Sequence, residues 1–193
     1  MMSIASTDKV VFLDRDGVIN QDSPQYIKSW SEFEFIPGSL EALAALNRSG
    51  FEAIIITNQS AVHRGLISTA DLEQMHDQMQ AVVQSHGGRI LDIFYCPHLP
   101  EEGCNCRKPR PGMIRRACNK YGIDPIRATM IGDRATDIEC ARNAGCGKAA
   151  LVRTGSGIAT LTQLKARGVP IDFVAENLVD AVQWIIRCAA GRP

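Results

Sequence analysis

The sequence predicts an α/β fold: a doubly wound, Rossmann-like parallel sheet with helices on both faces and no separate cap domain. Short apolar runs alternate along the chain with longer segments of helical apolar spacing, and polar or acidic residues directly follow several of these runs. Strands that alternate with helices form βαβ units with right-handed crossovers. Because ligands of such sheets bind beyond the carboxyl ends of the strands, we expect the functional residues there.

The apolar runs and the helical spacing place the individual elements. Buried strands are predicted at 9–13, 51–56, 90–95, 129–131, 149–152 and 173–175. Helices are predicted at 38–50, 68–86, 112–121, 135–144 and 178–189. Ser68 or Thr69 is expected to cap one helix, and Gly145 to end another. No role is predicted for residues 161–172.

Composition and charge exclude several classes of protein. The 193 residues suit a single domain over 1–193, and the 21 Lys and Arg balance the 21 Asp and Glu. This balance argues against a nucleic-acid surface, and no apolar run approaches the roughly 20 residues that span a bilayer. A polar N-terminus without a signal-peptide pattern predicts a cytoplasmic protein whose seven cysteines are reduced thiols or metal ligands. The absence of an unused hydrophobic stripe favours a monomer.

Two carboxylates follow the first predicted strand. In an extended chain Asp14 and Asp16 face the same way, so both can address one point, and Gly17 follows them. Magnesium prefers one or two carboxylates together with phosphate oxygens of a substrate. One acid can then attack phosphorus while its neighbour handles protons. A pair of turn or helix-capping acids is the alternative interpretation.

Three further groups follow later apolar runs. After the second strand come Thr57, Asn58, Gln59 and Ser60, neutral donors suited to phosphate oxygens or to an ordinary turn. Arg107 and Lys108 precede a proline turn, where they can neutralise a phosphoryl group or form a solvated basic loop. Asp133 follows the fourth strand and can complete a magnesium site. Asp137 lies one helical turn further, where it can support Asp133 or Lys108, or simply the helix N-terminus.

The order Asp-x-Asp-Gly, Thr-Asn, Lys-Pro and Gly-Asp-x-x-x-Asp resembles the four motifs of the haloacid-dehalogenase-like hydrolases, over most of the chain. The resemblance implies a Mg²⁺-dependent phosphatase with a phospho-aspartate intermediate. It assigns Asp14 as the nucleophile and Asp16 as the general acid/base. Thr57 and Lys108 would hold the phosphoryl group, and Mg²⁺ would be bound at Asp14, Asp16 and Asp133.

A metal-binding spacing, C-x-H-x₅-C-x-C, occupies the loop 95–107. Its three thiols and one imidazole, from Cys96, His98, Cys104 and Cys106, form the closed set that suits a structural Zn²⁺. A chance set of thiols is the alternative. Because two cations directly follow this loop, a bound zinc ion would fix them over the active site and act on catalysis indirectly.

Two branches of the family share this loop, one acting on D-glycero-D-manno-heptose 1,7-bisphosphate in bacterial heptose precursor synthesis and the other on histidinol phosphate. Residues 14–23 and 151–155 resemble the heptose branch, whereas 96–100 and 132–138 are also similar to the histidinol-phosphate branch. A bisphosphate needs a second anion site, and spare cations on the loops favour this substrate, a small-molecule sugar phosphate. Substrate contacts are expected from Asp22, Ser23, Pro24, Gln25, Asn58, Gln59, Ser60, Arg64, Arg107 and Arg134.

A non-enzymatic interpretation is a zinc-stapled binding module that has lost catalysis. Such a module would be expected to lack one of Asp14, Asp16, Lys108 or Asp133, and the chain carries all four. A phosphotransferase or mutase would use the same phospho-aspartate, but the expected absence of a cap favours water as the acceptor. A DNA 3′-phosphatase is disfavoured by the neutral charge balance.

Overall fold

A six-stranded parallel sheet organises the protein, which we describe from a computed structural model covering residues 9–191. The strand order is β3-β2-β1-β4-β5-β6, and every pairing is parallel. The strands are β1 (Val10–Leu13), β2 (Glu52–Asn58), β3 (Ile90–Cys96), β4 (Thr129–Gly132), β5 (Lys148–Val152) and β6 (Phe173–Ala175). Because β1 pairs with both β2 and β4, the chain order reverses beside β1. A crevice at this switch point is where doubly wound sheets bind ligands.

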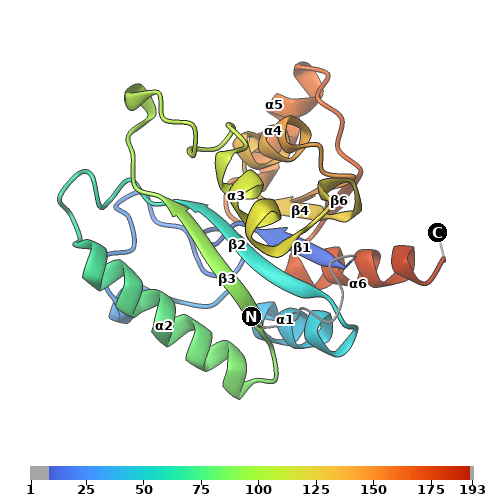
Figure 1. Ribbon diagram of the computed structural model, residues 1–193, viewed down its shortest axis with the longest axis horizontal. Helices are drawn as coiled ribbons and strands as arrows, with labels where there is room; N and C mark the ends of the chain where they lie inside the picture. Colours follow the sequence, from blue (N-terminus) through green and yellow to red (C-terminus); the bar gives the residue numbers. More distant parts are fainter. Residues whose placement is uncertain (1–8, 192–193) are drawn as a thin grey trace.

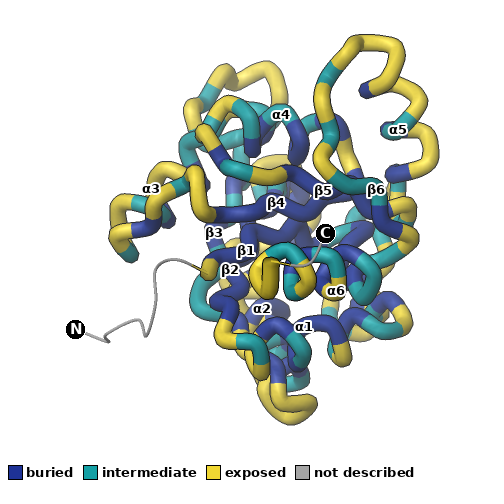
Figure 2. The backbone as a smooth tube through the Cα atoms, turned by 90° about the vertical axis from the view of Figure 1, so that its right-hand side faces the viewer, coloured by how far each residue is buried: buried dark blue, intermediate teal, exposed yellow. Residues whose placement is uncertain are grey.

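Helices cover both faces of the sheet (Figures 1 and 2). One layer holds α1 (Ser39–Arg48), α2 (Thr69–Ser85) and α6 (Leu178–Ala189), and the other holds α3 (Gly112–Tyr121), α4 (Ala135–Ala144) and α5 (Gly157–Ala166). Short 3₁₀ turns lie at Trp30–Glu32, Pro100–Glu102 and Pro125–Arg127. None of the helices described between residues 9 and 191 combines the length and apolar character needed to cross a membrane.

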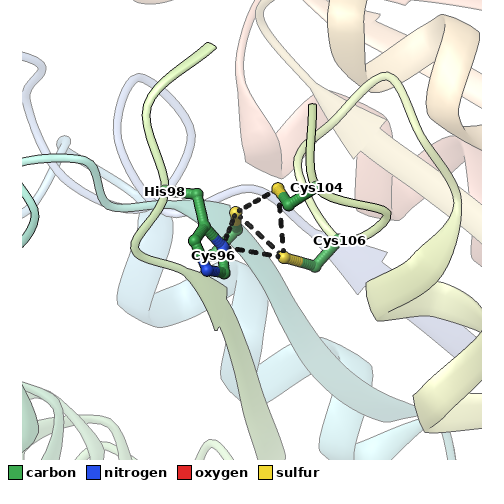
Figure 3. A group of neighbouring side chains, drawn as sticks. All are labelled: Cys96, His98, Cys104 and Cys106. Carbon is green, nitrogen blue, oxygen red and sulfur yellow. Dashed lines mark hydrogen bonds between the residues drawn. The ribbon is translucent and has the colours of Figure 1, made fainter. Parts of the chain in front are cut away.

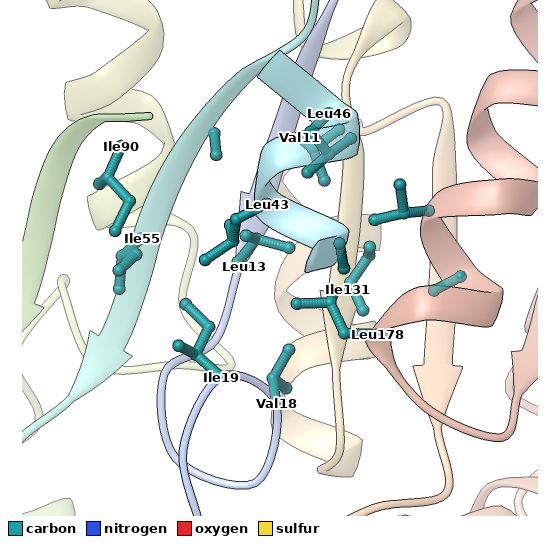
Figure 4. Close-up of a cluster of buried hydrophobic side chains, with 14 of the residues drawn as sticks. Val11, Leu13, Val18, Ile19, Leu43, Leu46, Ile55, Ile90, Ile131 and Leu178 are labelled. Atoms are coloured by element: carbon teal, nitrogen blue, oxygen red, sulfur yellow. The ribbon is translucent and has the colours of Figure 1, made fainter. Parts of the chain in front are cut away.

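The alternation of side chains along β1 divides the apolar core into two layers. Val11 and Leu13 pack with α1, α2 and α6, as Figure 4 shows for part of this cluster. Val10 and Phe12 point into the other layer, with α3, α4 and α5. All four side chains are buried, as expected for a central strand of a parallel sheet that is covered on both faces.

The fold class predicted from the sequence is confirmed, and so are the predicted strands and helices, with shifts of one or two residues at their ends. Ser68 is the N-cap of α2, and its side chain and that of Asp71 form a reciprocal capping box. Two differences matter for function. Strand β2 extends through Thr57 and Asn58, and residues 157–166 form α5, a helix that the apolar pattern did not predict.

The buried position of Leu43 on α1 leads to a prediction about stability. Leu43→Ala removes a fully buried side chain from the layer shown in Figure 4, so we expect it to lower the free energy of unfolding by about 2–5 kcal/mol. Leu66 is 46% exposed, and Leu66→Ala should change stability by no more than about 0.5 kcal/mol. Urea unfolding of both variants measures the difference. Equal losses would contradict the assignment of Leu43 to the core.

Candidate active site

The predicted catalytic residues converge at the carboxyl edge of the sheet, beside the switch point. Asp14 follows β1, Thr57 lies near the end of β2 and Asp133 follows β4. The backbone N–H of Asp14 donates to the carbonyl of Ile131 at 3.0 Å, which continues the β1–β4 pairing past the end of β1. This hydrogen bond fixes the backbone from which the Asp14 carboxylate projects.

Lys108 is a buried cation at the centre of the site. Its Nζ lies 2.9 Å from Oδ1 of Asp14 and 2.6 Å from Oδ1 of Asp137, and it donates to the carbonyl of Ile56 at 2.8 Å. Burial works to lower the pKa of Lys108, but the two carboxylates raise it above its usual value. Lys108 therefore stays charged, and its three donors are all used.

Asn58 fixes the backbone that carries this lysine. Its side-chain Oδ1 accepts from the N–H of Lys108 at 3.1 Å, and its Nδ2 donates to the carbonyl of the same residue at 3.3 Å. Asn58 lines the cleft, as predicted for a substrate contact, but these two hydrogen bonds give it a structural task as well. The extension of β2 to Asn58 is what brings its amide to the loop of Lys108.

Asp133 is a fully buried carboxylate with incomplete pairing. Its Oδ2 accepts from the N–H of Ser156 at 2.7 Å, while its Oδ1 has no hydrogen-bond partner within the described chain. Burial, together with the charges of Asp137 and Asp14, raises the pKa of Asp133 to about 8. Burial likewise raises the pKa of Asp14 to about 6, although Lys108 opposes the rise.

These carboxylates fit a divalent cation. Oxygen atoms of Asp14, Asp133 and Asp137 lie within 4.8 Å of one another. Asp137 already pairs with Lys108 and accepts from the N–H of Arg134, so the unpartnered oxygen of Asp133 and the Oδ2 of Asp14 remain for a metal. Hard oxygen donors with excess negative charge are the set that Mg²⁺ prefers. A cation here would also oppose the burial and the carboxylate repulsion that together raise the pKa values of Asp14 and Asp133.

The Asp16 carboxylate does not join this cluster, contrary to the expectation that its side chain and that of Asp14 would address one point. Beyond β1 the chain turns, and Arg15 binds both oxygens of Asp16 through Nη2 at 2.8 and 3.0 Å. Asn20 and Gln59 also donate to Asp16, at 2.9 and 2.8 Å. Burial alone would raise the pKa of Asp16, but Arg15 and these hydrogen bonds lower it below the usual value. The carboxylate still borders the cleft.

A cleft of about 970 Å³ opens above these residues. Of the ten predicted substrate contacts, those that line it are Asp22, Ser23, Pro24, Asn58, Gln59, Ser60, Arg107 and Arg134. Gln25 and Arg64 do not line it: Gln25 is exposed on its turn, and the guanidinium of Arg64 lies 5.9 Å from the ring centre of Tyr26. Gln59 is also largely committed, since its amide donates to Asp16 and to Oγ1 of Thr57.

The opposite wall of the cleft comes from the unpredicted helix α5. Ala159, Thr160 and Gln163 line the cleft there, after Ser156 at the end of the β5 loop. Only the position of Ser156 just beyond a predicted strand could have indicated this wall. Arg15 was missed for a different reason, because its place between two acids gave no sign that it is buried and pairs with one of them.

The cations at the rim are held by the cysteine-rich loop. Nη1 of Arg107 donates to the carbonyl of His98 at 2.9 Å, and Nη1 of Arg110 donates to the carbonyl of Cys104 at 2.6 Å. Arg134 pairs with Asp22 at 2.6 Å across the cleft. The orientation of two of the three guanidinium groups thus depends on the backbone of this loop.

The four side chains with metal-ligand spacing form one cluster (Figure 3). Cys96, His98, Cys104 and Cys106 come within 4.8 Å of one another, and the separations between their sulfur and Nδ1 atoms that join neighbours range from 3.2 to 3.6 Å. Ligands at about 2.3 Å from a tetrahedral zinc ion lie roughly 3.5–3.8 Å apart, so a small expansion of this cluster would give the spacing of a zinc site. The three cysteines of the cluster are free thiols that form no disulfide.

Known proteins are similar to this chain over most of its length. Residues 105–181 match the HAD-hydrolase-like family. The D-glycero-beta-D-manno-heptose-1,7-bisphosphate 7-phosphatase of Bordetella bronchiseptica is 44% identical over 155 residues, 80% of this chain and 86% of that protein. The chain belongs to the haloacid-dehalogenase-like hydrolases. The enzyme of the same name from Pseudomonas aeruginosa is 45% identical over 152 residues, 79% of this chain and 85% of that one.

A solved structure of another haloacid-dehalogenase-like hydrolase agrees with the fold. It is the D,D-heptose 1,7-bisphosphate phosphatase of B. bronchiseptica complexed with magnesium and phosphate, and it shares 41% sequence identity and a TM-score of 0.87. The match covers 93% of this chain and 98% of that one. The family membership predicted from the four motifs is therefore confirmed.

The close approach of Gly17 to Asp133 gives a prediction for this haloacid-dehalogenase-like hydrolase. A Cβ at Gly17 would overlap the Asp133 carboxylate, and φ is +80° there; Gly87 has the same φ but open space around it. We expect Gly87→Ala to cost about 1 kcal/mol in the free energy of unfolding, and Gly17→Ala about 1–3 kcal/mol more. Chemical unfolding of both variants tests this. Equal costs would show that the overlap is relieved without strain.

Proposed function

We propose that this chain is a Mg²⁺-dependent phosphatase that removes the 7-phosphate of D-glycero-D-manno-heptose 1,7-bisphosphate in bacterial heptose precursor synthesis for lipopolysaccharide. The observation that carries this proposal is the pairing of a buried nucleophile, Asp14, with Lys108 below a cation-rimmed cleft. The names of the two relatives and their near full-length match support the same substrate.

In the proposed reaction, Asp14 attacks phosphorus in line with the C7 oxygen. Oδ1 of Asp14 accepts from Lys108 and from the N–H of Arg15, and these two contacts fix the orientation of the attacking carboxylate. The phosphorus–oxygen bond to the sugar breaks, and Asp16 gives its proton to the departing oxygen. For this step Asp16 must take up a proton when the anionic substrate binds, against the lowering of its pKa by Arg15. Water then attacks the aspartyl phosphate, and Asp16 takes its proton. Positioning and charge stabilisation account for most of the rate of such transfers.

Two groups hold the phosphoryl oxygens in this proposal. Lys108 supplies a fixed positive charge, and Thr57 offers a buried hydroxyl that the Gln59 amide orients at 3.0 Å. Asp133 and Asp14 would bind Mg²⁺, whereas the Asp16 side chain is held outside this cluster by Arg15. The metal would neutralise charge on the transferring group. Its place is supported by the unpartnered oxygen of Asp133.

The cations at the rim favour a bisphosphate over histidinol phosphate. Arg107, Arg110 and Arg134 all line the cleft and can bind a second phosphate group. Histidinol phosphate carries an amine and an imidazole instead, which would favour acidic or aromatic partners. A binding module without catalysis is disfavoured because Asp14 and Lys108 retain the geometry that the chemistry needs.

The Cys/His cluster is assigned a structural role in this proposal. Its closed donor set would hold Zn²⁺, and the metal would fix the carbonyl groups that orient Arg107 and Arg110. We further propose that residues 1–193 form a single domain that acts as a monomer in the cytoplasm. Size-exclusion chromatography with light scattering tests the monomer.

The substrate assignment predicts a defined assay result. With Mg²⁺, phosphate should be released from the heptose 1,7-bisphosphate faster than from histidinol phosphate. Asp14→Asn removes the nucleophile and should lower kcat by roughly three orders of magnitude or more. Asp77→Asn, an exposed aspartate on α2, is the matched control and should match the unchanged protein. Chelation of Mg²⁺ should abolish turnover.

Each alternative result has a separate meaning. Preference for histidinol phosphate would keep the mechanism and overturn the substrate. Turnover that survives Asp14→Asn would overturn the phospho-aspartate. No release from either compound would reject the proposed substrate class.

The zinc proposal predicts a link between metal content and substrate binding. Cys104→Ser should reduce the zinc content below one ion per chain and raise KM for the bisphosphate about tenfold. Without the metal, the carbonyl groups of His98 and Cys104 would no longer be fixed, and these groups orient Arg107 and Arg110. Cys118→Ser, outside the cluster, should retain both properties. Elemental analysis and steady-state kinetics provide the readouts. Full zinc content in Cys104→Ser would contradict the assignment of this thiol as a ligand.

A further inference from the structure

A buried histidine on α2 lies next to the acid/base group, although no motif includes it. His76 is 4% exposed, and its Nε2 lies 3.2 Å from Nη1 of Arg15. The His76 ring makes an edge contact with the ring of Tyr95, with centroids 5.9 Å apart. The histidine thus projects from the helical layer of α1, α2 and α6 toward the loop between β1 and α1.

The direction of this hydrogen bond fixes the form of the histidine. A guanidinium group has only donors, so Nε2 of His76 must accept, and the ring proton must sit on Nδ1. Burial and the neighbouring Arg15 charge lower the pKa of His76 to about 3. The imidazole is therefore neutral in the range where the protein would work, and it acts as a fixed acceptor.

Arg15 divides its donors between this histidine and Asp16. Its side chain is 1% exposed; Nε and Nη2 contact the Asp16 carboxylate, and Nη1 faces His76. The other neighbours of the guanidinium are the sulfur of Met75, 3.9 Å from Nη1, and the ring of Phe33, 5.9 Å from Cζ. Neither is a strong acceptor, so within the described chain His76 is the polar group that sets the rotation of Nη1.

We propose that His76 is a positioning residue for Asp16 and acts through Arg15. The inference rests on the proposed acid/base role of Asp16. By accepting from Nη1, His76 holds the guanidinium in the plane where Nη2 and Nε meet the carboxylate. A planar guanidinium cannot turn toward a new partner for one nitrogen without moving the others.

Substitution of His76 should impair catalysis rather than substrate binding. An apolar ring at position 76 would fill the same space but leave a buried donor of Arg15 without an acceptor, which favours a rotated guanidinium. Asn20 and Gln59 would still hold Asp16, so its alignment would loosen rather than disappear. Proton transfer depends on that alignment, whereas binding of the bisphosphate depends on the rim cations. The loss should therefore appear in kcat and not in KM.

The test compares matched variants of the full chain. His76→Phe removes the acceptor and keeps a ring, and His76→Gln can return an acceptor oxygen near the position of Nε2. We expect His76→Phe to lower kcat about tenfold to a hundredfold with KM unchanged, and His76→Gln to restore most of the rate. His86→Phe makes the same change at an exposed histidine after α2 and should match the unchanged protein. Rates of His76→Phe equal to those of the unchanged protein would overturn the proposal.

A second readout needs no turnover. NMR can follow the Nε proton of Arg15, whose resonance is assigned by its loss in Arg15→Lys. This proton should exchange slowly with water in the unchanged protein and in His76→Gln. It should exchange faster in His76→Phe, and in His76→Asn, whose shorter amide does not reach Arg15. If His76→Phe does not fold, His76→Asn decides both readouts.

The two readouts separate the inference from the proposed function. Should the unchanged protein hydrolyse no phosphate ester, the proposed function fails, and the exchange data alone decide whether His76 holds Arg15 on Asp16. Unchanged exchange in both His76→Phe and His76→Asn would overturn the inference even in an active enzyme.

Discussion

The site depends on the pairing of one buried ammonium group with partners from three different segments. Moving a charge out of water costs several kcal/mol, and only close partners offset this cost. Lys108 meets them in Asp14 after β1, Asp137 on α4 and the carbonyl of Ile56 in β2. Each partner is fixed by the sheet or by the helix that follows it. The loop of Lys108 is thereby held against both sides of the switch point, and the nucleophile receives its counter-charge from the buried side of the cleft.

The same requirement explains why the two catalytic carboxylates occupy separate environments. Asp14 is buried and shares Lys108 with Asp137, so burial and the charge of Asp137 raise the pKa of Asp14 to about 6, although Lys108 opposes the rise. Asp16 pairs with the Arg15 guanidinium, and the pKa of Asp16 falls below the usual value. Separate counter-charges let neighbouring acids take different roles. The excess negative charge around Asp133 is what a divalent cation would balance.

Sequence patterns predicted the sheet and the strand-end residues because both follow from local rules. A buried strand needs an apolar run, and parallel connectivity brings the residue after each run to one edge. The patterns could not place α5, since Thr160 and Leu164 provide too few buried positions to mark an apolar stripe. Nor could they show that Arg15 is buried, because its partners Asp16 and His76 meet only in the folded chain.

The distribution of residues around the cleft separates chemistry from selectivity. Apart from Lys108, which lies on a loop before α3, the groups that would attack phosphorus and balance its charge stand at strand ends, where the sheet fixes them. The rim that would recognise the rest of the substrate comes from loops and from α5, and Arg107 and Arg110 there are oriented by carbonyl groups of the Cys/His loop. Loops accept changes in sequence that strand ends do not. A structural metal in that loop would give it the rigidity that it cannot draw from an apolar core, so precise recognition of a small substrate would not need a cap domain.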